Sequence, residues 1–301
     1  MNEEKNLTKT NINWYPGHMA KTKRQIMEDM KLIDVVIQVI DSRIPKSSQN
    51  PDLIKMIEGK KTIIALNKND LSDSNQNKKW CEHFERIGIM PVLINCATGE
   101  GIKELKNSIK RLMSEEIKNY AEKGRIGKTI KCIIVGIPNA GKSSLINKLA
   151  NKNSLEVGNK PGVTKQKKWI RIDDNIELLD TPGVLWPKFE SNEIALNLAY
   201  TGAIKDEVLD KEEIAFCLVK HLVKNEIDSI NSRYGLTHDK IKEIILNSYD
   251  ENTGIYEIIM QIGRKRGALV SGGNIDSAKT SNIILEDFRS GKLGRITLEK
   301  I

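Results

Sequence analysis

The chain has 301 residues, of which 39% are hydrophobic and 29% are charged. This composition is typical of a soluble globular protein with one large domain or two ordinary ones, and it excludes a collagenous, mucin-like or wholly disordered chain. The 48 Lys and Arg residues outnumber the 40 Asp and Glu residues, which gives a formal net charge of +8. A basic excess favours an acidic partner, either nucleic acid or a membrane surface.

The sequence lacks the patterns of an exported or membrane-spanning protein. No run approaches the roughly 18 consecutive apolar residues of a membrane span. The first ten residues, MNEEKNLTKT, contain two acids and no apolar core, and so predict neither a signal nor a transit peptide. The cysteines form no CxxC pair, which indicates reduced thiols; they are Cys81, Cys96, Cys132 and Cys217. We therefore expect a cytoplasmic protein without a membrane partner.

Up to about residue 185 the chain alternates strand-like and helix-like segments. Short apolar runs rich in β-branched residues predict strands at Asp34–Ile40, Thr62–Leu66, Met90–Ile94, Lys131–Val135 and Ile176–Leu179. Amphipathic stretches predict helices at Ala20–Met30, Pro51–Glu58, Asn77–Arg86, Ile102–Lys118 and Ser143–Leu149. This alternation predicts an α/β fold with a mostly parallel sheet and helices on both faces. In such sheets ligands bind at the carboxyl ends of the strands.

From about Glu190 onward, apolar residues recur only at helical spacing. The predicted helices are Ile194–Tyr200, Glu212–Leu222, Ile241–Tyr249, Ile255–Ile262 and Asp276–Phe288. We therefore predict a flexible N-terminus over 1–12, an α/β domain over 13–185 and an all-α C-terminal domain over 186–301.

The segment GIPNAGKSS, Gly136–Ser144, matches the phosphate-binding pattern GxxxxGK[ST] between a predicted strand and a predicted helix. Glycines let successive backbone amides and the helix N-terminus face negative charge. The pattern predicts that Lys142 reaches the β- and γ-phosphates and that Ser143 binds Mg²⁺. The other predicted nucleotide-binding residues of this loop are Asn139, Ala140, Gly141 and Ser144.

Two further segments follow the phosphate-binding loop. DTPG, Asp180–Gly183, comes directly after a predicted strand, where the Asp180 carboxylate can join the Mg²⁺ shell and the Gly183 amide can meet the γ-phosphate. Thr164 lies between the two motifs, in PGVT, and is the predicted hydroxyl that completes the Mg²⁺ site when a γ-phosphate is present.

The segment NKND, Asn67 to Asp70, indicates which base is bound. The Asp70 carboxylate can accept hydrogen bonds from both N1–H and N2–H of guanine, a donor pair that adenine lacks. Asn67 would support the base edge, and the stem of Lys68 would pack over the ring. In the segment Asn95-Cys96-Ala97, after the next strand, the Ala97 amide would meet guanine O6. GTP or GDP is the predicted ligand, and ATP is the weaker alternative.

The order of these motifs is unusual. GTPases ordinarily carry the phosphate loop, the switch threonine, DxxG, NKxD and then the alanine loop. Here NKND and NCA precede GIPNAGKSS, PGVT and DTPG, so the same parts are circularly permuted. The helical domain therefore follows directly after the predicted γ-phosphate sensor, which offers a mechanical route from nucleotide state to the second domain.

The chain resembles the circularly permuted GTPases, and within them the ribosome biogenesis GTPase A family. The resemblance covers about Ile12 to Glu299 and rests on NWYPGHMAK, DSRIP, NKND, GIPNAGKSS, PGVTK, DTPGVLWPKFE, TGAIKDEVLD and the stretch from GGNID to FRSGKLGRITLE. It implies a cytoplasmic bacterial factor that binds the immature large ribosomal subunit late in its maturation. It also implies that the helical domain binds RNA.

The chain lacks the glutamine that small GTPases use for hydrolysis. Val184 follows the DxxG glycine, where small GTPases carry the Gln that orients the attacking water. We therefore expect slow intrinsic turnover, on the order of 10⁻⁴ to 10⁻² per second, and stimulation by the partner. Lys142, Thr164 and Gly183 are the predicted contributors to catalysis. Asn139 matches the position at which related GTPases hold K⁺, which would supply positive charge beside the phosphates.

Two further residues leave alternatives open. His18 lies in the Pro/Gly-shaped segment PGHM, and the resemblance marks it as a proposed water-orienting residue. A capping or RNA-contacting role ahead of the following helix is the equal alternative. Arg43 is a candidate arginine finger, although pairing with Asp41 is the favoured interpretation.

Three basic regions predict RNA contacts. One flanks the switch threonine, the second lies near the C-terminus, and the third, Lys21 to Arg24, adjoins Trp14 and Tyr15. Any one of them alone is typical of a solvated surface, whereas all three together favour binding to rRNA phosphates and bases. The predicted RNA-binding residues are Lys165, Lys167, Lys168, Arg264, Lys265, Arg266, Arg289, Lys292 and Arg295.

The motifs thus predict a GTPase, and the resemblance implies that it is a monomer required for late assembly of the large (50S) ribosomal subunit. It would bind the subunit precursor, with its rRNA and ribosomal proteins, in the GTP state and leave after ribosome-stimulated hydrolysis. Two alternatives stay open: a nucleotide-gated RNA-binding module with incidental hydrolysis, and a GTPase that acts on tRNA or the small subunit.

Overall fold

The computed structural model describes residues 18–124, 127–150, 156–157, 169–179, 181, 185–186 and 189–301. The chain divides into two compact units. The sheet unit comprises the described residues up to Lys188 together with Thr297–Ile301, and the helical unit comprises Phe189–Ile296. In sequence, the helical unit is therefore inserted between two segments of the sheet unit. The boundary predicted at residues 185 and 186 lies close to this division, but the return of 297–301 has no counterpart in the hydrophobic pattern.

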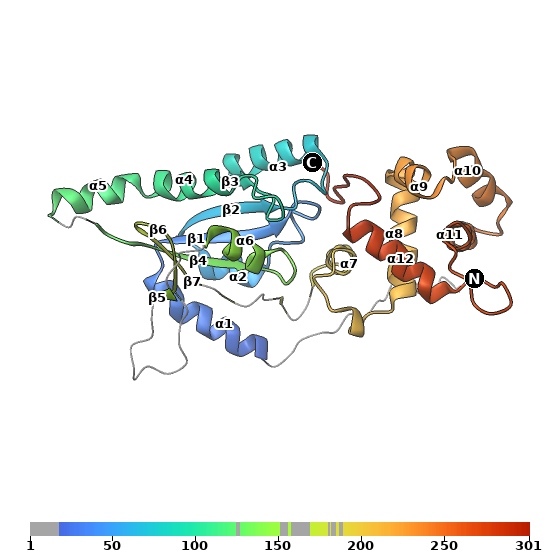
Figure 1. Ribbon diagram of the computed structural model, residues 1–301, viewed down its shortest axis with the longest axis horizontal. Coiled ribbons are helices and arrows are strands. Elements are labelled where there is room, and N and C mark those ends of the chain that lie inside the picture. The colour runs from blue at the N-terminus through green and yellow to red at the C-terminus, as the bar shows by residue number, and fades with distance from the viewer. Residues whose placement is uncertain are drawn as a thin grey trace, which may run out of the picture. The chain divides into compact units, whose positions relative to one another are not determined.

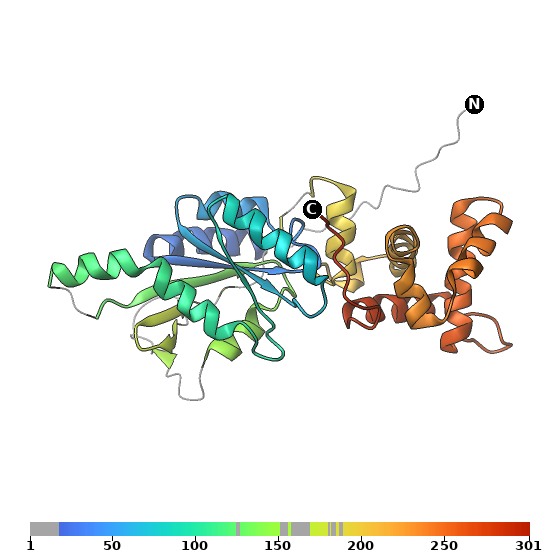
Figure 2. The same cartoon turned by 90° about the horizontal axis from the view of Figure 1, so that it is seen from above.

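The sheet unit contains a seven-stranded sheet of order β3-β2-β1-β4-β7-β6-β5 (Figures 1 and 2). The strands are β1 (Val35–Asp41), β2 (Lys61–Asn67), β3 (Met90–Leu93), β4 (Ile130–Gly136), β5 (Glu156–Val157), β6 (Trp169–Asp173) and β7 (Ile176–Leu179). The first four strands and β7 run parallel, whereas β6 pairs antiparallel with β7 and with β5. The five parallel strands, β1 to β4 and β7, are the five that the sequence predicts. The sequence pattern missed β6 because its residues alternate between buried and exposed, as in a sheet-edge strand, and form no continuous apolar run.

Helices cover both faces of the sheet's centre. The helices of this unit are α1 (His18–Asp29), α2 (Pro51–Ile57), α3 (Ser74–Arg86), α4 (Ile102–Leu112), α5 (Ser114–Glu122) and α6 (Lys142–Leu149). On one face, α1 and α2 pack on Val36, while α3 packs on Ile40, which points the same way because strand residues alternate. α4 contacts β2 and β3, and α6 contacts β4. β1 is buried at every position, which confirms the predicted α/β fold class. The helix predicted over 102–118 is divided at Met113, between α4 and α5.

The helical unit consists of helices connected by short segments, drawn from yellow to red in Figure 1. Its α-helices are α7 (Asn192–Tyr200), α8 (Lys211–Asn225), α9 (Ile227–Tyr234), α10 (His238–Asn247), α11 (Glu251–Arg266) and α12 (Ser277–Arg289). α8 contacts α7, α9, α11 and α12 and so forms the centre of the unit. Side chains cap most of the N-termini by accepting backbone N–H bonds, and these caps are Ser191, Asp210, Thr237, Asp250 and Asp276. Within the described ranges, no helix is long and apolar enough to cross a membrane.

Candidate nucleotide-binding site

The predicted motifs lie at the carboxyl edge of the parallel strands. β2 ends at Asn67, the first residue of NKND, and β4 ends at Gly136, the first residue of the phosphate-binding loop. β3 ends just before Asn95, and β7 ends just before Asp180. The strand order reverses between β1 and β4, because β2 and β3 lie on one side of β1 and β4 lies on the other. Ligands of open α/β sheets bind at such a switch point.

The phosphate-binding loop has a backbone that only particular residues allow. Gly141, the N-cap of α6, has a φ of 104°, and a Cβ there would lie 2.1 Å from the side-chain nitrogen Nδ2 of Asn67. Gly136 is equally confined, since a Cβ would lie 2.3 Å from the carbonyl oxygen of Val39. Asn139 between them has a left-handed φ of 56°. These residues form the tight turn that brings the N-terminus of α6 to the pocket edge.

A pocket of about 400 Å³ opens at this edge. Its walls come from the loops that follow β2, β3 and β4: Asn67, Lys68, Asp70, Leu71, Asn95, Cys96, Ala97, Asn139, Gly141, Lys142, Ser143 and Ser144. The structure thus brings together three motifs that are far apart in the sequence. Ala140 is buried directly beside the pocket, and its carbonyl oxygen accepts a hydrogen bond from Asn67. A site built from three loops suits a ligand that is polar at both ends, such as a nucleotide.

The phosphate end of the pocket combines a buried cation with exposed hydroxyls. Lys142 is 7% exposed, and its ammonium donates to the carbonyl oxygen of Ile137 at 2.7 Å. Ser143 and Ser144 are exposed at the N-terminus of α6. A hydroxyl beside a phosphate-reaching lysine is the donor set that Mg²⁺ uses with nucleotide phosphates, so Ser143 fits the predicted metal role.

Asn67 joins two of the three loops through its side-chain amide. Its Nδ2 donates to the carbonyl oxygen of Ala140 at 2.7 Å, and its Oδ1 accepts from the backbone amide of Cys96 at 3.0 Å. Both ends of the side-chain amide are therefore engaged inside the protein. Through these two bonds Asn67 holds the phosphate-binding loop and the NCA loop in a fixed relation, and its predicted support of the base edge stays a prediction.

The base end of the pocket contains an exposed carboxylate and a neutral thiol. Asp70 is exposed, as a residue that reads guanine N–H groups must be. The amide of Ala97 donates to Oδ1 of Asn95 at 2.8 Å. To donate to guanine O6, this amide must share its hydrogen between the two acceptors or break its bond to Asn95. Burial raises the pKa of the Cys96 thiol to about 11, which keeps this pocket-lining group uncharged.

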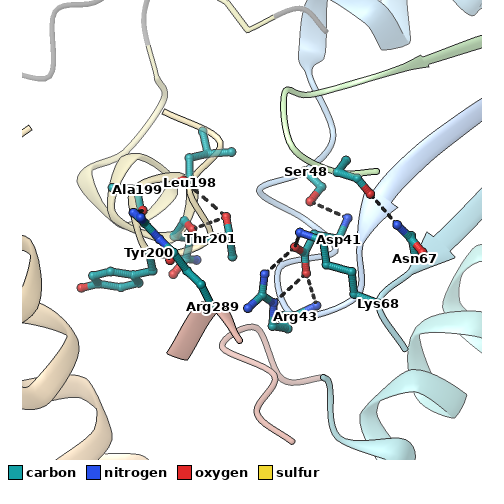
Figure 3. A network of polar contacts seen from close by, with 12 residues as sticks. Asp41, Arg43, Ser48, Asn67, Lys68, Leu198, Ala199, Tyr200, Thr201 and Arg289 are labelled. Atoms are coloured by element: carbon teal, nitrogen blue, oxygen red, sulfur yellow. Dashed lines mark hydrogen bonds and ion pairs between the residues drawn. The ribbon is translucent and has the colours of Figure 1, made fainter. Parts of the chain in front are cut away.

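Lys68 is held by a buried charge cluster behind the pocket (Figure 3). Its ammonium lies 2.9 Å from Oδ2 of Asp41, the last residue of β1. Arg43 donates to both oxygens of the same carboxylate, at 3.0 and 2.8 Å. Burial alone would raise the pKa of Asp41, but the charges of Arg43 and Lys68 hold it well below its usual range. The favoured pairing of Arg43 with Asp41 is confirmed. The sequence analysis did not predict the contact between Lys68 and Asp41, although the charged segment DSR, Asp41 to Arg43, at the end of a predicted strand was a signal for it.

Several predicted site residues lie outside the described part of the structure. These are Thr164, Lys165, Lys167, Lys168, Asp180 and Gly183. His18 is the first residue of α1. Thr181, inside DTPG, is described: its hydroxyl donates to the carbonyl oxygen of Ile134 on β4, which fixes the start of this motif beside the phosphate-binding strand.

The basic residues of the helical unit fall into two kinds. Arg264, Lys265 and Arg266 are exposed in the last turn of α11, and Lys292 and Arg295 are exposed after α12. In contrast, the guanidinium of Arg289 is committed to the interior of the unit. It donates to both oxygens of Asp206 at 2.8 and 3.0 Å. It also donates to the carbonyl oxygens of Ala199 and Tyr200, which lie beside it in Figure 3. We therefore assign Arg289 a structural role and remove it from the RNA-contacting set.

The sheet, the phosphate-binding loop and the base-reading loops define a P-loop GTPase whose motifs are circularly permuted. Residues 35–190 match the family described as RsgA GTPase, and residues 131–253 match the family described as 50S ribosome-binding GTPase. The chain is 43% identical to ribosome biogenesis GTPase A of Bacillus cereus, over 96% of this chain and 93% of that protein. It is 42% identical to the same protein of Bacillus licheniformis, over 96% and 98%. The chain belongs to the ribosome biogenesis GTPase A family.

A solved structure agrees with this membership. The crystal structure of GNP-bound YlqF from Thermotoga maritima has a TM-score of 0.63 and 26% sequence identity with this chain. The match covers 93% of this chain and 98% of that one, so it includes residues of both units.

Proposed function

We propose that the chain binds a guanine nucleotide at the carboxyl edge of its sheet, hydrolyses GTP there, and uses the nucleotide state to control its binding to an immature large ribosomal subunit. The observation that supports the nucleotide assignment is the convergence of NKND, NCA and the phosphate-binding loop on one pocket. The resemblance to ribosome-assembly GTPases supports the choice of partner.

In this proposal, the two ends of the nucleotide are read by different elements. Asp70 accepts the N–H groups of guanine, while the backbone amides at the start of α6 and the ammonium of Lys142 bind the phosphates. To do so, Lys142 exchanges its bond to Ile137 for bonds to phosphate oxygens. Ser143, Thr164 and Asp180 would hold Mg²⁺, which supplies positive charge against the phosphates when bound.

Hydrolysis itself needs a group that orients water, and Val184 cannot provide one. We assign this role to His18 and the K⁺-binding role to Asn139, which lines the pocket. Because the chain offers no glutamine at the usual position, intrinsic turnover is slow and the matured subunit stimulates it. This arrangement makes hydrolysis a signal for release.

Binding to rRNA is assigned to exposed basic residues. The helical unit presents Arg264, Lys265 and Arg266 side by side at the end of α11, where lysine and arginine can neutralise phosphates. Lys292 and Arg295 add charge after α12. The segment around Thr164 would add Lys165, Lys167 and Lys168. We propose that the protein acts as a monomer.

GTP hydrolysis measured in K⁺ and in Na⁺ buffer, with and without purified large subunits, tests the proposal. We expect a slow basal rate that rises strongly with large subunits and only in K⁺. A rate indifferent to large subunits, together with cosedimentation on small subunits or tRNA, would overturn the choice of partner. An equal rate in the two buffers would remove the role of Asn139.

A second experiment separates a hydrolysing switch from a gated binding module. A His18→Ala protein that binds GTP but does not hydrolyse it should stay on large-subunit particles. If it dissociates as the unsubstituted protein does, hydrolysis is incidental to release.

A further inference from the structure

The last five residues, Thr297–Ile301, form part of the sheet unit although the helical unit precedes them in sequence. We name these residues the C-terminal tail. Thr297 and Leu298 are 1% and 7% exposed, so the tail is seated on the unit rather than projecting from it. Its partners lie in two segments: the loop after β1 and the beginning of α3.

The first set of contacts joins the tail to the loop after β1. The amide of Leu298 donates to the carbonyl oxygen of Arg43 at 2.9 Å. The carboxylate of Glu299 accepts from the backbone amides of Lys46 and Ser47, at 2.5 and 3.0 Å, and from the hydroxyl of Ser47. Hydrogen bonds to a carboxylate are stronger than those between neutral groups, so Glu299 is the principal anchor of the tail.

The second set joins the tail to α3 and its N-cap. The amide of Asp73 donates to the Thr297 hydroxyl at 3.0 Å, and Nε1 of Trp80 donates to the carbonyl oxygen of Glu299 at 2.8 Å. At the chain end, the amide of Ile301 donates to Oε1 of Gln76 at 3.0 Å. Asp73 follows Asp70 by three residues, so this set reaches the segment that reads the base.

The first set leads to the same segment by another route. Arg43, whose carbonyl oxygen binds the tail, is 1% exposed and places its guanidinium on Asp41. Asp41 in turn binds the ammonium of Lys68, which lines the nucleotide pocket. Lys68 has a left-handed φ of 60°, a conformation that a non-glycine residue adopts only when its surroundings hold it. One line of contacts therefore leads from the tail to Lys68 in the pocket, and the other ends at Asp73, three residues after Asp70.

We infer that the C-terminal tail is a positioning element for the base-reading loop, acting through Arg43 and Asp41 on Lys68. Docking of the tail tightens the binding of the guanine base, and by thermodynamic reciprocity the bound nucleotide strengthens the docking of the tail. The inference rests on the proposed function, because Lys68 matters in this way only if the pocket holds a guanine nucleotide. It gives the helical unit a second link to the site, in addition to the chain that follows β7: the chain continues at residue 297 into the tail, and the tail binds the sheet unit through hydrogen bonds.

The test compares nucleotide binding by the full chain, a Glu299→Gln variant and a chain lacking 297–301. Titration with a fluorescent GDP gives the dissociation constants, and competition with unlabelled pyrophosphate measures the phosphate end alone. We expect GDP binding to weaken about fivefold to tenfold in the truncated chain, and less in Glu299→Gln, because couplings of this kind are commonly fivefold or more. Pyrophosphate binding should not change, since Lys68 lies at the base end. A purely structural loss would weaken both ligands together.

A matched control and a second readout make the result decisive. Glu104→Gln removes a carboxylate of an exposed ion pair with Arg111 on α4 and should leave both affinities unchanged. Hydrogen exchange at the Leu298 amide should slow when GDP is added to the full chain. The factor by which exchange slows should equal the factor by which truncation weakens GDP binding. The inference is overturned if the full chain binds GDP and folded tail variants bind it equally well. If the full chain does not bind GDP, the proposed function is wrong, and this inference, which rests on it, is wrong as well.

Discussion

Replacement of Asn67 by alanine is the sharpest test of how the nucleotide pocket is assembled. Asn67 is 3% exposed, and its amide bridges the carbonyl oxygen of Ala140 and the backbone amide of Cys96, at 2.7 and 3.0 Å. Asn67→Ala removes both bonds and leaves two buried backbone groups without their partner. A buried polar group left unsatisfied costs about 1–3 kcal/mol. Because the two bonds share one side chain, their costs do not simply add.

We therefore expect Asn67→Ala to lower the free energy of unfolding by about 2–4 kcal/mol, a large part of the roughly 5–15 kcal/mol that holds a typical protein folded. The affinity for GDP should also fall, by about tenfold or more, since 1.4 kcal/mol corresponds to a factor of ten. The reason is that the phosphate-binding loop and the NCA loop are no longer held in one relation. Urea denaturation measures the first effect, and titration with fluorescent GDP under native conditions measures the second.

Two companion variants define what the result means. Asn147→Ala, on the exposed face of α6, changes the same residue type without breaking a buried bond and should shift stability by less than about 0.5 kcal/mol. Asn67→Asp keeps an acceptor for the Cys96 amide but loses the donor to Ala140, so it should still bind GDP poorly. If Asn67→Ala unfolds at the same urea concentration as the unsubstituted protein and binds GDP equally well, the assigned bridging role is wrong.

Three other expectations concern the helical unit. Arg289→Met should destabilise it by about 2 kcal/mol, seen as a lower melting temperature, because Asp206 and two helix-end carbonyl oxygens lose their donor. Replacing Arg264, Lys265 and Arg266 together by alanine should leave the melting temperature unchanged but weaken rRNA binding and reduce the slope of log affinity against log salt by about 2. Burial raises the pKa of Asp287, but the hydrogen bond and charge of Arg233 hold it below its ordinary 3.8. The stabilisation that Asp287 provides is therefore present above about pH 4 and is lost as the pH falls further. The free energy of unfolding, measured by denaturant titration, should therefore change less between pH 7 and pH 3 in Asp287→Asn than in the unsubstituted protein.

The sequence predicted the sheet and the pocket well because both depend on local patterns. A buried parallel strand appears as a short apolar run, and the motif after it occupies the carboxyl edge whatever the distant residues are. NKND, NCA and the phosphate-binding loop could therefore be expected in one place. The sequence could not indicate how their side chains divide the work. Asn67 and the Ala97 amide both bind other protein groups, and those contacts depend on the approach of loops that are far apart along the chain.

Charge counting failed for Arg289 for a related physical reason. A basic residue near other basic residues is read as solvent-facing, yet its environment depends on which acids and carbonyl oxygens the fold brings to it. Asp206 lies 83 residues away in sequence, so no local pattern marks this pair. Arg264 to Arg266 and Arg289 all stand in the last turn of a helix, where the helix dipole favours cations. The difference is tertiary: the first three side chains remain in solvent, whereas Arg289 meets Asp206 and two backbone carbonyl oxygens.

The tail shows how circular permutation changes what the chain ends can do. Moving the phosphate-binding strand to the fourth position makes β7 the last strand, so the chain leaves the sheet unit soon after the DTPG segment and enters the helical unit. Residues 297–301 then return it to the loop after β1, and Glu299 binds Lys46 across 253 positions in sequence. The helical unit thus continues at both of its ends into segments of the sheet unit: the chain that follows β7, and the tail, which is hydrogen-bonded to the loop after β1 and to α3. In the proposed function, a change at either end of the nucleotide would be transmitted along one of these connections, which an unpermuted order with a single C-terminal extension does not provide.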